Sequence, residues 1–300
     1  QFPTPGCTQR RMRLLLLALV SSAAAAQTFE LERVQLNAGA AETWLAQSGD
    51  GLSAGQLRVG LVAHYEHRPL VLTADGVPAG AYVSSRVTAH LLAAYAFFDW
   101  LELSAQLPVV AYQTGDDLSR YGLSRPQHTA MGAPWLGVRT TLLRQRAQQH
   151  LDLGISLNVS FPAGTAAALT RDAGLGLAFA PKLGAGRAFG PVRVGLEAGV
   201  LLRGAGTVAG DTDNAVGSQF NGALVVSTHA LPVHAELAAR VVAPFTTARA
   251  SVELTGAVGT TFAKQFELTL LGGPGFGKTP GVPAFRVMLA FAWTPQLPSL

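Results

Sequence analysis

Residues 151–161 read Leu-Asp-Leu-Gly-Ile-Ser-Leu-Asn-Val-Ser-Phe, and every second residue of this stretch is apolar. Successive side chains of a β-strand point to opposite faces, so the leucines, Ile155, Val159 and Phe161 would share one face. Asp152, the two serines and Asn158 would share the other. An apolar face opposite a polar face is typical of a strand that separates lipid from a polar interior.

The same alternation recurs along the chain. It is clear in residues 57–66, 86–97, 101–109, 192–202, 233–241, 252–262 and 285–293, and weaker in Leu136–Leu143, Leu177–Gly186, Phe220–Thr228 and Phe266–Gly272. The total of about twelve is even, as bacterial single-chain barrels require. The sequence therefore predicts an all-β fold, a transmembrane antiparallel up-and-down β-barrel of about 12 strands in residues 56–293, with both termini periplasmic.

Composition supports a membrane protein without helical spans. Only 13% of the 300 residues are charged, whereas soluble chains carry about 25%. The longest apolar stretch after the leader, Leu91–Phe98, is much shorter than the roughly 20 residues of a spanning helix. A closed barrel is the other structure that satisfies all backbone groups in lipid. A soluble β-sandwich is the alternative interpretation.

The N-terminus has the layout of a secretory signal peptide. A basic patch, Arg10 to Arg13, precedes the apolar run Leu14–Val20 and a small-residue stretch that ends at Ala26. We assign residues 1–26 to upstream sequence and signal peptide, with Met12 as initiator. The only cysteine, Cys7, lies in this part, so the mature chain would have neither a disulfide nor a thiol nucleophile. Residues 27–55 are expected to form a plug, a periplasmic segment or a disordered lead-in.

The connections between the predicted strands alternate between short and long. Residues 98–100, 188–190, 229–232 and 263–265 are short; residues 68–81, 112–134, 162–174 and 203–218 are long. Outer-membrane barrels have short periplasmic turns and long external loops. Aromatic residues would gather at both strand ends, with Tyr65, Tyr82, Trp135, Phe161, Phe220 and Phe285 at the outer one. Pro181 falls inside a predicted strand, where we expect a bulge or a shifted boundary.

Charged residues within the predicted strands face the interior. They are Arg58, Glu66, Arg86, Glu102, Arg139, Asp152, Lys182, Arg193, Glu197, Arg203, Glu236, Arg240, Glu253, Glu267 and Arg286. A charge that faces hydrocarbon costs about 2–4 kcal/mol at the membrane midplane, which alone would explain this segregation. Two interpretations remain: a salt-bridge network that stiffens the wall, or a wet pore lined by both signs.

Short motifs of enzymes and metal sites occur, but their context does not fit. Residues 272–279 match the phosphate-loop pattern, yet prolines and a glycine follow where a helix must begin. Residues 51–55 match the nucleophile-elbow pattern without the strand-to-helix setting. His64 and Glu66 would share a strand face while His67 points away, and a metal needs more ligands. Asp116-Asp117 and residues 211–214 are interpreted as solvated loop acids. We predict no catalytic residue, cofactor or metal.

Several segments resemble a known family. The chain is similar to the N-terminal barrel region of OmpA-family outer-membrane proteins of the myxobacterial type, over most of residues 29–293. The segments that carry this resemblance are residues 29–33, 64–66, 69–72, 88–95, 99–103, 105–110, 115–118 and 283–287. The resemblance implies an outer-membrane barrel with a role in the cell envelope. Such relatives continue into a periplasmic peptidoglycan-binding domain; residues 294–300 would be only a tail or the start of a linker, so peptidoglycan binding is not expected from this chain.

Three functions are therefore open. The first is a passive pore for small solutes, the second a structural outer-membrane barrel with a filled lumen, and the third a barrel-embedded lipid-modifying enzyme. No Ser/His/acid set can be assembled for the third, so we expect no enzyme. The expected partners are outer-membrane lipids and the barrel-assembly machinery of a Gram-negative bacterium. Without its leader the chain is nearly neutral and has no basic patch, so nucleic acid is not an expected partner.

Overall fold

The structure is a computed structural model that describes residues 29–32, 34–39, 43–74, 77–208, 211–228, 233–246 and 248–295. The predicted signal peptide, the predicted turn at residues 229–232 and residues 296–300 lie outside the described residues. Among the described residues, no helix is long and apolar enough to cross a membrane. The elements are β1 (Leu57–Ala74), β2 (Val77–Phe98), β3 (Leu101–Thr114), η1 (Ser119–Tyr121), β4 (Ala130–Met131), β5 (Trp135–Leu143), η2 (Gln145–Ala147), β6 (Asp152–Ser160), η3 (Ala166–Ala168), β7 (Ala178–Phe189), β8 (Val192–Leu201), β9 (Gly206–Val208), β10 (Asp211–Val216), β11 (Gln219–Thr228), β12 (Val233–Pro244), β13 (Ser251–Phe262), β14 (Phe266–Phe276) and β15 (Phe285–Trp293).

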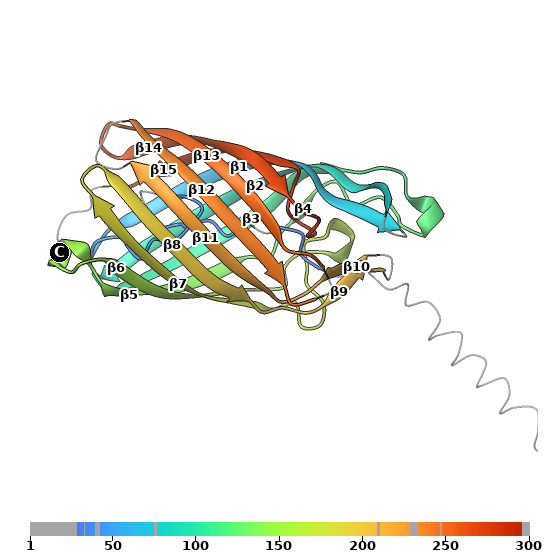
Figure 1. The fold of residues 1–300 in the computed structure, drawn as a ribbon, viewed down its shortest axis with the longest axis horizontal. Helices are drawn as coiled ribbons and strands as arrows, with labels where there is room; N and C mark the ends of the chain where they lie inside the picture. Colours follow the sequence, from blue (N-terminus) through green and yellow to red (C-terminus); the bar gives the residue numbers. More distant parts are fainter. Residues whose placement is uncertain are drawn as a thin grey trace, which may run out of the picture.

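Twelve of these strands close into one antiparallel barrel (Figure 1). Each barrel strand pairs with the next along the chain, in the order β1-β2-β3-β5-β6-β7-β8-β11-β12-β13-β14-β15, and β15 pairs back with β1. Strand β4 adds a short pairing to β3, and β9 and β10 form a separate hairpin. The predicted up-and-down barrel is confirmed. Closure leaves no open sheet edge, which is the condition for a sheet in lipid.

Burial in the barrel is inverted relative to a soluble protein. In β6, the apolar side chains of Ile155 and Leu157 are exposed, whereas Asp152 and Ser156 are buried. The same holds around the ring, with exposed fractions of 64% at Leu237 and 60% at Val258. Since alternate residues point to opposite faces, this pattern places the apolar set outward and the polar set inward.

The two ends of the barrel differ. One end, here called the turn end, has short connections such as Asp99-Trp100; the other, the loop end, has the long ones. The predicted long loop at residues 68–81 is wrong: β1 and β2 continue as a paired ribbon as far as Ala74 and Val77, with register shifts after His67. The ribbon extends beyond the barrel in Figure 1. It persists because Leu70 and Leu72 are buried at the loop end, so the strands have an apolar face to cover there.

Pro181 produces neither the expected bulge nor a shifted boundary. Its strand β7 keeps one register with β6 from Gly186 to Ala178. On the other side, the ladder between β7 and β8 stops at Lys182 and resumes in the same register at the isolated bridge from Phe179 to Leu202. The missing N–H of proline therefore interrupts the ladder with β8 locally and leaves the pairing with β6 intact.

Two aromatic residues assigned to the outer girdle face inward instead. Tyr82 is buried with Leu70 and Leu72 in the cluster at the loop end, and Trp135 packs against the buried Ala178 and Ala180. At the turn end, Phe98 stacks on Trp100 at the surface, with ring centroids 5.5 Å apart. The prediction assumed that the alternation of inward and outward side chains continues without a break to every strand end. Tyr82 lies at one of the register shifts between β1 and β2, where this alternation is broken.

Candidate functional site: a plugged lumen

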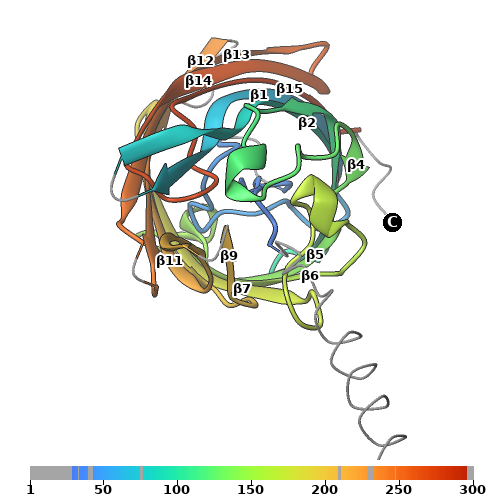
Figure 2. The ribbon, with the colours of Figure 1, turned by 90° about the vertical axis from the view of Figure 1, so that its right-hand side faces the viewer.

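The described residues between Phe29 and Gly55, here called the plug segment, run through the barrel from the loop end to the turn end. Glu30 bridges to Thr170 at the loop end, and Gly55 N–H donates to Ala96 O at the turn end, 2.7 Å away. Figure 2, viewed along the barrel, shows the blue segment inside the ring of strands. Of the three expectations for residues 27–55, the described part corresponds to a plug.

This path places the first described residue, Phe29, at the opposite end of the barrel from the start of β1. Strand β1 begins and β15 ends at the turn end, as expected for a barrel whose ends are both periplasmic. The plug segment, however, returns through the lumen, so Phe29 lies at the loop end, opposite residue 295. Both termini of the chain lie outside the described residues, so their predicted periplasmic location stays a prediction. The reversal follows from the polar wall, which offers partners to a backbone that would otherwise stay in water.

Wall side chains satisfy the backbone of the plug segment. Glu197 Oε2 accepts from Gln47 N–H at 2.8 Å, and Glu102 Oε2 accepts from Leu52 N–H at 3.0 Å. Arg193 donates through Nη2 to Ser48 O at 3.0 Å. Carboxylates thus take the N–H groups and guanidiniums take the carbonyls, so an irregular chain is hydrogen-bonded without being a strand.

Trp44 is the apolar anchor of the plug segment. Its side chain is buried within a cluster that includes Val62, Leu92 and Met288 of the wall. Its indole Nε1 donates to Glu267 Oε1 at 2.9 Å, and the guanidinium of Arg58 lies 4.7 Å from the ring centroid. A buried tryptophan needs a partner for its N–H, and this one also gains a cation–π contact.

The lumen-facing strands make room for this backbone with glycines. A Cβ atom at Gly184 of β7 would overlap the carbonyl oxygen of Gln47, and one at Gly186 would overlap that of Ser48. Only residues without a side chain allow the plug backbone to approach the wall this closely.

The structure places the predicted inward charges in this interior. All of them are buried except Arg203 and Arg240, which are partly buried. Most form ion pairs of opposite sign: Arg58–Glu267 at 3.0 Å, Arg139–Glu102 at 3.4 Å, Lys182–Glu197 at 3.1 Å, Arg193–Asp152 at 2.7 Å, Arg203–Asp172 at 3.3 Å, Arg240–Glu253 at 3.8 Å, Arg86–Glu66 at 3.9 Å, and Arg286 with both Glu66 at 2.9 Å and Glu253 at 2.8 Å. Glu236 instead accepts from Thr43 Oγ1 and from Trp44 N–H of the plug segment.

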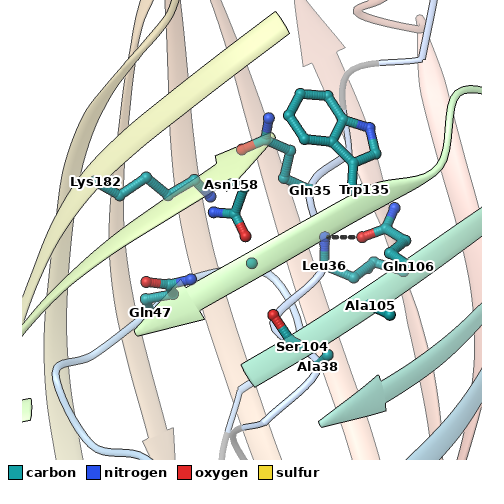
Figure 3. Close-up of a pocket in the computed structure, with 11 residues that line it drawn as sticks. Gln35, Leu36, Ala38, Gln47, Ser104, Ala105, Gln106, Trp135, Asn158 and Lys182 are labelled. Carbon is teal, nitrogen blue, oxygen red and sulfur yellow. Dashed lines mark hydrogen bonds between the residues drawn. The ribbon is translucent and has the colours of Figure 1, made fainter. Parts of the chain in front are cut away.

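Little space remains between plug and wall on the β3–β5 side. A cavity of about 20 Å³ lies between plug residues such as Gln35 and wall residues such as Gln106, Asn158 and Lys182 (Figure 3). Gln106 Oε1 accepts from Leu36 N–H there, at 3.3 Å. Such a volume holds about one water molecule.

At the loop end, the first residues of the plug segment are buried together with loop acids. Glu30 N–H donates to Asp172 Oδ1 at 2.9 Å, and Arg203 donates to Glu30 O at 2.8 Å. Burial, followed by the nearby charge of Asp172, raises the pKa of the Glu30 carboxyl well above its usual range. This carboxyl therefore holds its proton more tightly when the segment is docked.

The short motifs behave as loop and strand sequence. Residues 272–276 of the phosphate-loop match belong to β14, and no helix follows them. His67 stacks on Phe285, away from His64 and Glu66. In the acid pair, Asp116 accepts from Ala81 N–H and Asp117 from Ser119 N–H.

Comparison with known proteins gives structural relatives only. No family model matches this chain, and no curated protein matches its sequence. Its structure is similar to that of an outer membrane channel from Pseudomonas putida F1, with 14% identity over 82% of this chain and 98% of that chain and a TM-score of 0.57. It is also similar to the KdgM porin, with 6% identity over 79% and 99% of the two chains and a TM-score of 0.51. With its inverted burial and these neighbours, the chain has the fold of an outer-membrane β-barrel.

Proposed function

We propose that the protein is an outer-membrane channel for small solutes, and that the plug segment closes it in the state described here. The observation that carries this proposal is the attachment of the plug. It is held by hydrogen bonds to Glu102, Glu197, Glu236 and Arg193 rather than by a strand ladder. Water can replace such contacts, so the segment can leave without unfolding the wall.

The lumen that remains would be wet and lined by charges of both signs. The wall charges pair mostly with one another, so they keep their partners when the plug segment leaves. Both signs line the interior, and the inward glycines of β7 would then face water. We therefore infer passage of small polar solutes, with outer-membrane lipids around the exposed apolar exterior.

A second function is a structural barrel with a permanently filled lumen. The burial of Trp44 and the small size of the cavity on the β3–β5 side favour it. The two functions differ in whether the plug segment leaves the lumen on the time scale of transport.

Single-channel recording in planar bilayers separates them, with the wild-type protein and a variant that lacks residues 29–50. We expect steady conductance steps from the deletion variant and rare, voltage-dependent openings of similar size from the wild type. A wild type that stays silent while the deletion variant conducts would establish the structural barrel. Silence from a deletion variant that is shown to be folded by its heat-dependent migration in SDS would mean that wall side chains alone fill the lumen.

A further inference from the structure

Three side chains with metal-binding groups meet where the plug segment touches β1 and β2. His64 of β1 and His90 of β2 lie on the same inward face, two positions apart in the strand register. Glu32 comes from the plug segment. The Nε2 atoms of the histidines are 3.0 Å apart, and Glu32 Oε2 lies 3.1 Å from His64 Nε2. One ligand atom from each residue lies within 4.8 Å of the others, and all three side chains are buried.

The hydrogen bonds around the two rings leave a conflict between them. Arg286 Nη1 lies 2.8 Å from His64 Nδ1, and because arginine can only donate, this Nδ1 accepts. Gln106 contacts His90 Nδ1 through its amide nitrogen, an orientation set by its contacts with Leu36 N–H and Val34 O. Each neutral ring then carries its proton on Nε2, so two donors face each other at 3.0 Å. A cation between the rings would replace both protons.

The geometry suits a first-row divalent metal. Zinc binds histidine nitrogen at about 2.0–2.1 Å and carboxylate oxygen at about 2.0–2.2 Å, so tetrahedral ligand atoms lie about 3.3 Å apart. Two of the three observed separations, 3.0 and 3.1 Å, are within a few tenths of that spacing. The third, between His90 and Glu32, lies within 4.8 Å and shortens when a metal binds. Two imidazoles and one carboxylate bind Zn²⁺ and other first-row transition metals in preference to Ca²⁺ or Mg²⁺. We propose that His64 Nε2, His90 Nε2 and the Glu32 carboxylate form a binding site for Zn²⁺ or a similar transition-metal ion.

Metal binding rearranges two neighbours of the site. Each ring proton moves to Nδ1, where it needs an acceptor. The Gln106 amide turns so that its oxygen accepts from His90, and it gives up its contacts with Leu36 N–H and Val34 O. Arg286 Nη1 moves off His64 towards Glu66, which it already approaches within 2.9 Å, while its Nε stays with Glu253 at 2.8 Å. Glu66, two residues from His64 on the same face, is the acceptor for the His64 proton.

The site would connect the plug to the wall, since Glu32 belongs to the plug segment and both histidines to the barrel. A ligand that binds only the docked arrangement stabilises it by mass action. Resting on the proposed function, the metal therefore acts as a clamp that keeps the channel closed, and chelation favours opening.

The chain contains a matched control for the ligand set. His234 of β12 lies 3.6 Å from Glu267 Oε1, the oxygen that accepts from Trp44 of the plug segment. Among the described residues, the possible metal-binding group consists of Glu32, His64 and His90, and neither His234 nor Glu267 belongs to it. His234→Gln therefore removes a lumen-facing His–Glu pair without touching the proposed site.

Binding is tested by titrating chelator-treated, detergent-purified protein with Zn²⁺ in a calorimeter and with Co²⁺ in an absorption spectrometer. We expect one high-affinity ion in the wild type and in His234→Gln. His90→Gln removes a ligand and should weaken binding at least about 10-fold, the smallest loss seen even for partners of ligands. Glu32 belongs to the plug segment and not to the wall, so Glu32→Gln should weaken binding without disturbing the folding of the barrel. A folded wild type that binds no ion, or equal binding by wild type, His90→Gln and Glu32→Gln, would overturn the site.

The clamp is tested separately by the frequency of wild-type channel openings with Zn²⁺ and with chelator. Fewer openings with Zn²⁺, and no such response in Glu32→Gln, support it. Zinc binding without any change in opening frequency would leave the site in place and rule out the clamp. If the wild type never opens, the proposed function is wrong, while the titration still decides whether the site exists.

Discussion

Strand β6 and the plug segment lie side by side, yet their backbones are satisfied in different ways. Residues Asp152–Ser160 of β6 pair with β5 on one side and with β7 on the other. In the plug segment, Gln47 N–H is bonded to Glu197 and Leu52 N–H to Glu102, both side chains of the wall. The wall is therefore specified by its own ladders, and the plug by charges that the wall presents. Substitutions should affect the two regions through different partners.

The largest effect is expected at Glu197, which serves both regions. It pairs with Lys182 at 3.1 Å and also accepts from Gln47 N–H. Glu197→Gln leaves Lys182 buried without its counter-charge, so we expect a loss of about 3–5 kcal/mol in the free energy of unfolding. Chemical unfolding in detergent micelles, followed by tryptophan fluorescence, measures it.

The double variant Lys182→Met/Glu197→Gln is the control. It removes both charges and should recover most of the loss, because no ion remains buried alone. Equal destabilisation of the single and double variants would show that the contact with Gln47 matters more than the ion pair. Glu197 would then stabilise the docked plug rather than the wall.

The next effect concerns the wall alone. Leu237 of β12 is 64% exposed on the outer face. Leu237→Arg should destabilise the folded barrel in lipid by about 2–4 kcal/mol, as a cation near the midplane does, while leaving the plug contacts unchanged. Unfolding in lipid vesicles measures this loss.

Val233→Arg is the matched substitution on the same strand and face. Val233 is 59% exposed but lies at the turn end, where the expected loss is only about 0–1 kcal/mol. A similar loss at both positions would contradict the placement of Leu237 near the membrane midplane and of Val233 near its edge.

The sequence predicted the wall well because its signal is local and periodic. Alternation in residues 151–161 determines which side chains face outward, and the same reasoning placed Arg58, Glu236 and the other inward charges. The ribbon of β1 and β2 was missed because Arg68 and Pro69 interrupt the alternation, and only the buried Leu70 and Leu72 support the strand beyond them.

The plug could not be derived in the same way. Its backbone partners are side chains 50 to 150 residues away, as in Leu52 with Glu102 and Gln47 with Glu197, and no period in the sequence encodes such contacts. His64 was noticed, but its neighbours His90 and Glu32 belong to another strand and to the plug.

A smaller effect is expected where plug and wall touch most closely. Gly184→Ala places a methyl group against the carbonyl oxygen of Gln47. Overpacking of this kind costs about 1–3 kcal/mol, so the variant should open more often and unfold at lower denaturant concentration. In a variant that also lacks residues 29–50, Gly184→Ala should be neutral.

Gly256→Ala is the control for the substitution itself. It is also a strand glycine, but a Cβ there would meet nothing within 4 Å. We expect no loss of stability. If Gly184→Ala were destabilising even without the plug, the glycine would serve the strand rather than the plug, and the close approach would not explain its presence.

The smallest effect is a pH dependence at the loop end. Because burial raises the pKa of Glu30 in the docked segment, the Glu30 carboxyl binds a proton more tightly in the docked segment than in the released one. Its contribution to stability is therefore largest below the ordinary glutamate pKa of about 4.3 and declines as the pH rises towards the raised value. Glu30→Gln keeps the size of the side chain and cannot lose a proton, so it should remove this decline.

The test compares the temperatures at which Glu30→Gln and the wild type unfold in SDS, at an alkaline and at an acid pH. At mildly alkaline pH, Glu30→Gln should unfold at a higher temperature than the wild type, and in acid the two should agree. Asp117→Asn is the comparison, since Asp117 is an exposed loop acid whose pKa is lowered by the Ser119 N–H; it should not gain stability in alkali. If Glu30→Gln were less stable than the wild type at alkaline pH, the docked carboxyl would be stabilised as an anion, and the plug would be held at this end by charge as well as by its apolar contacts.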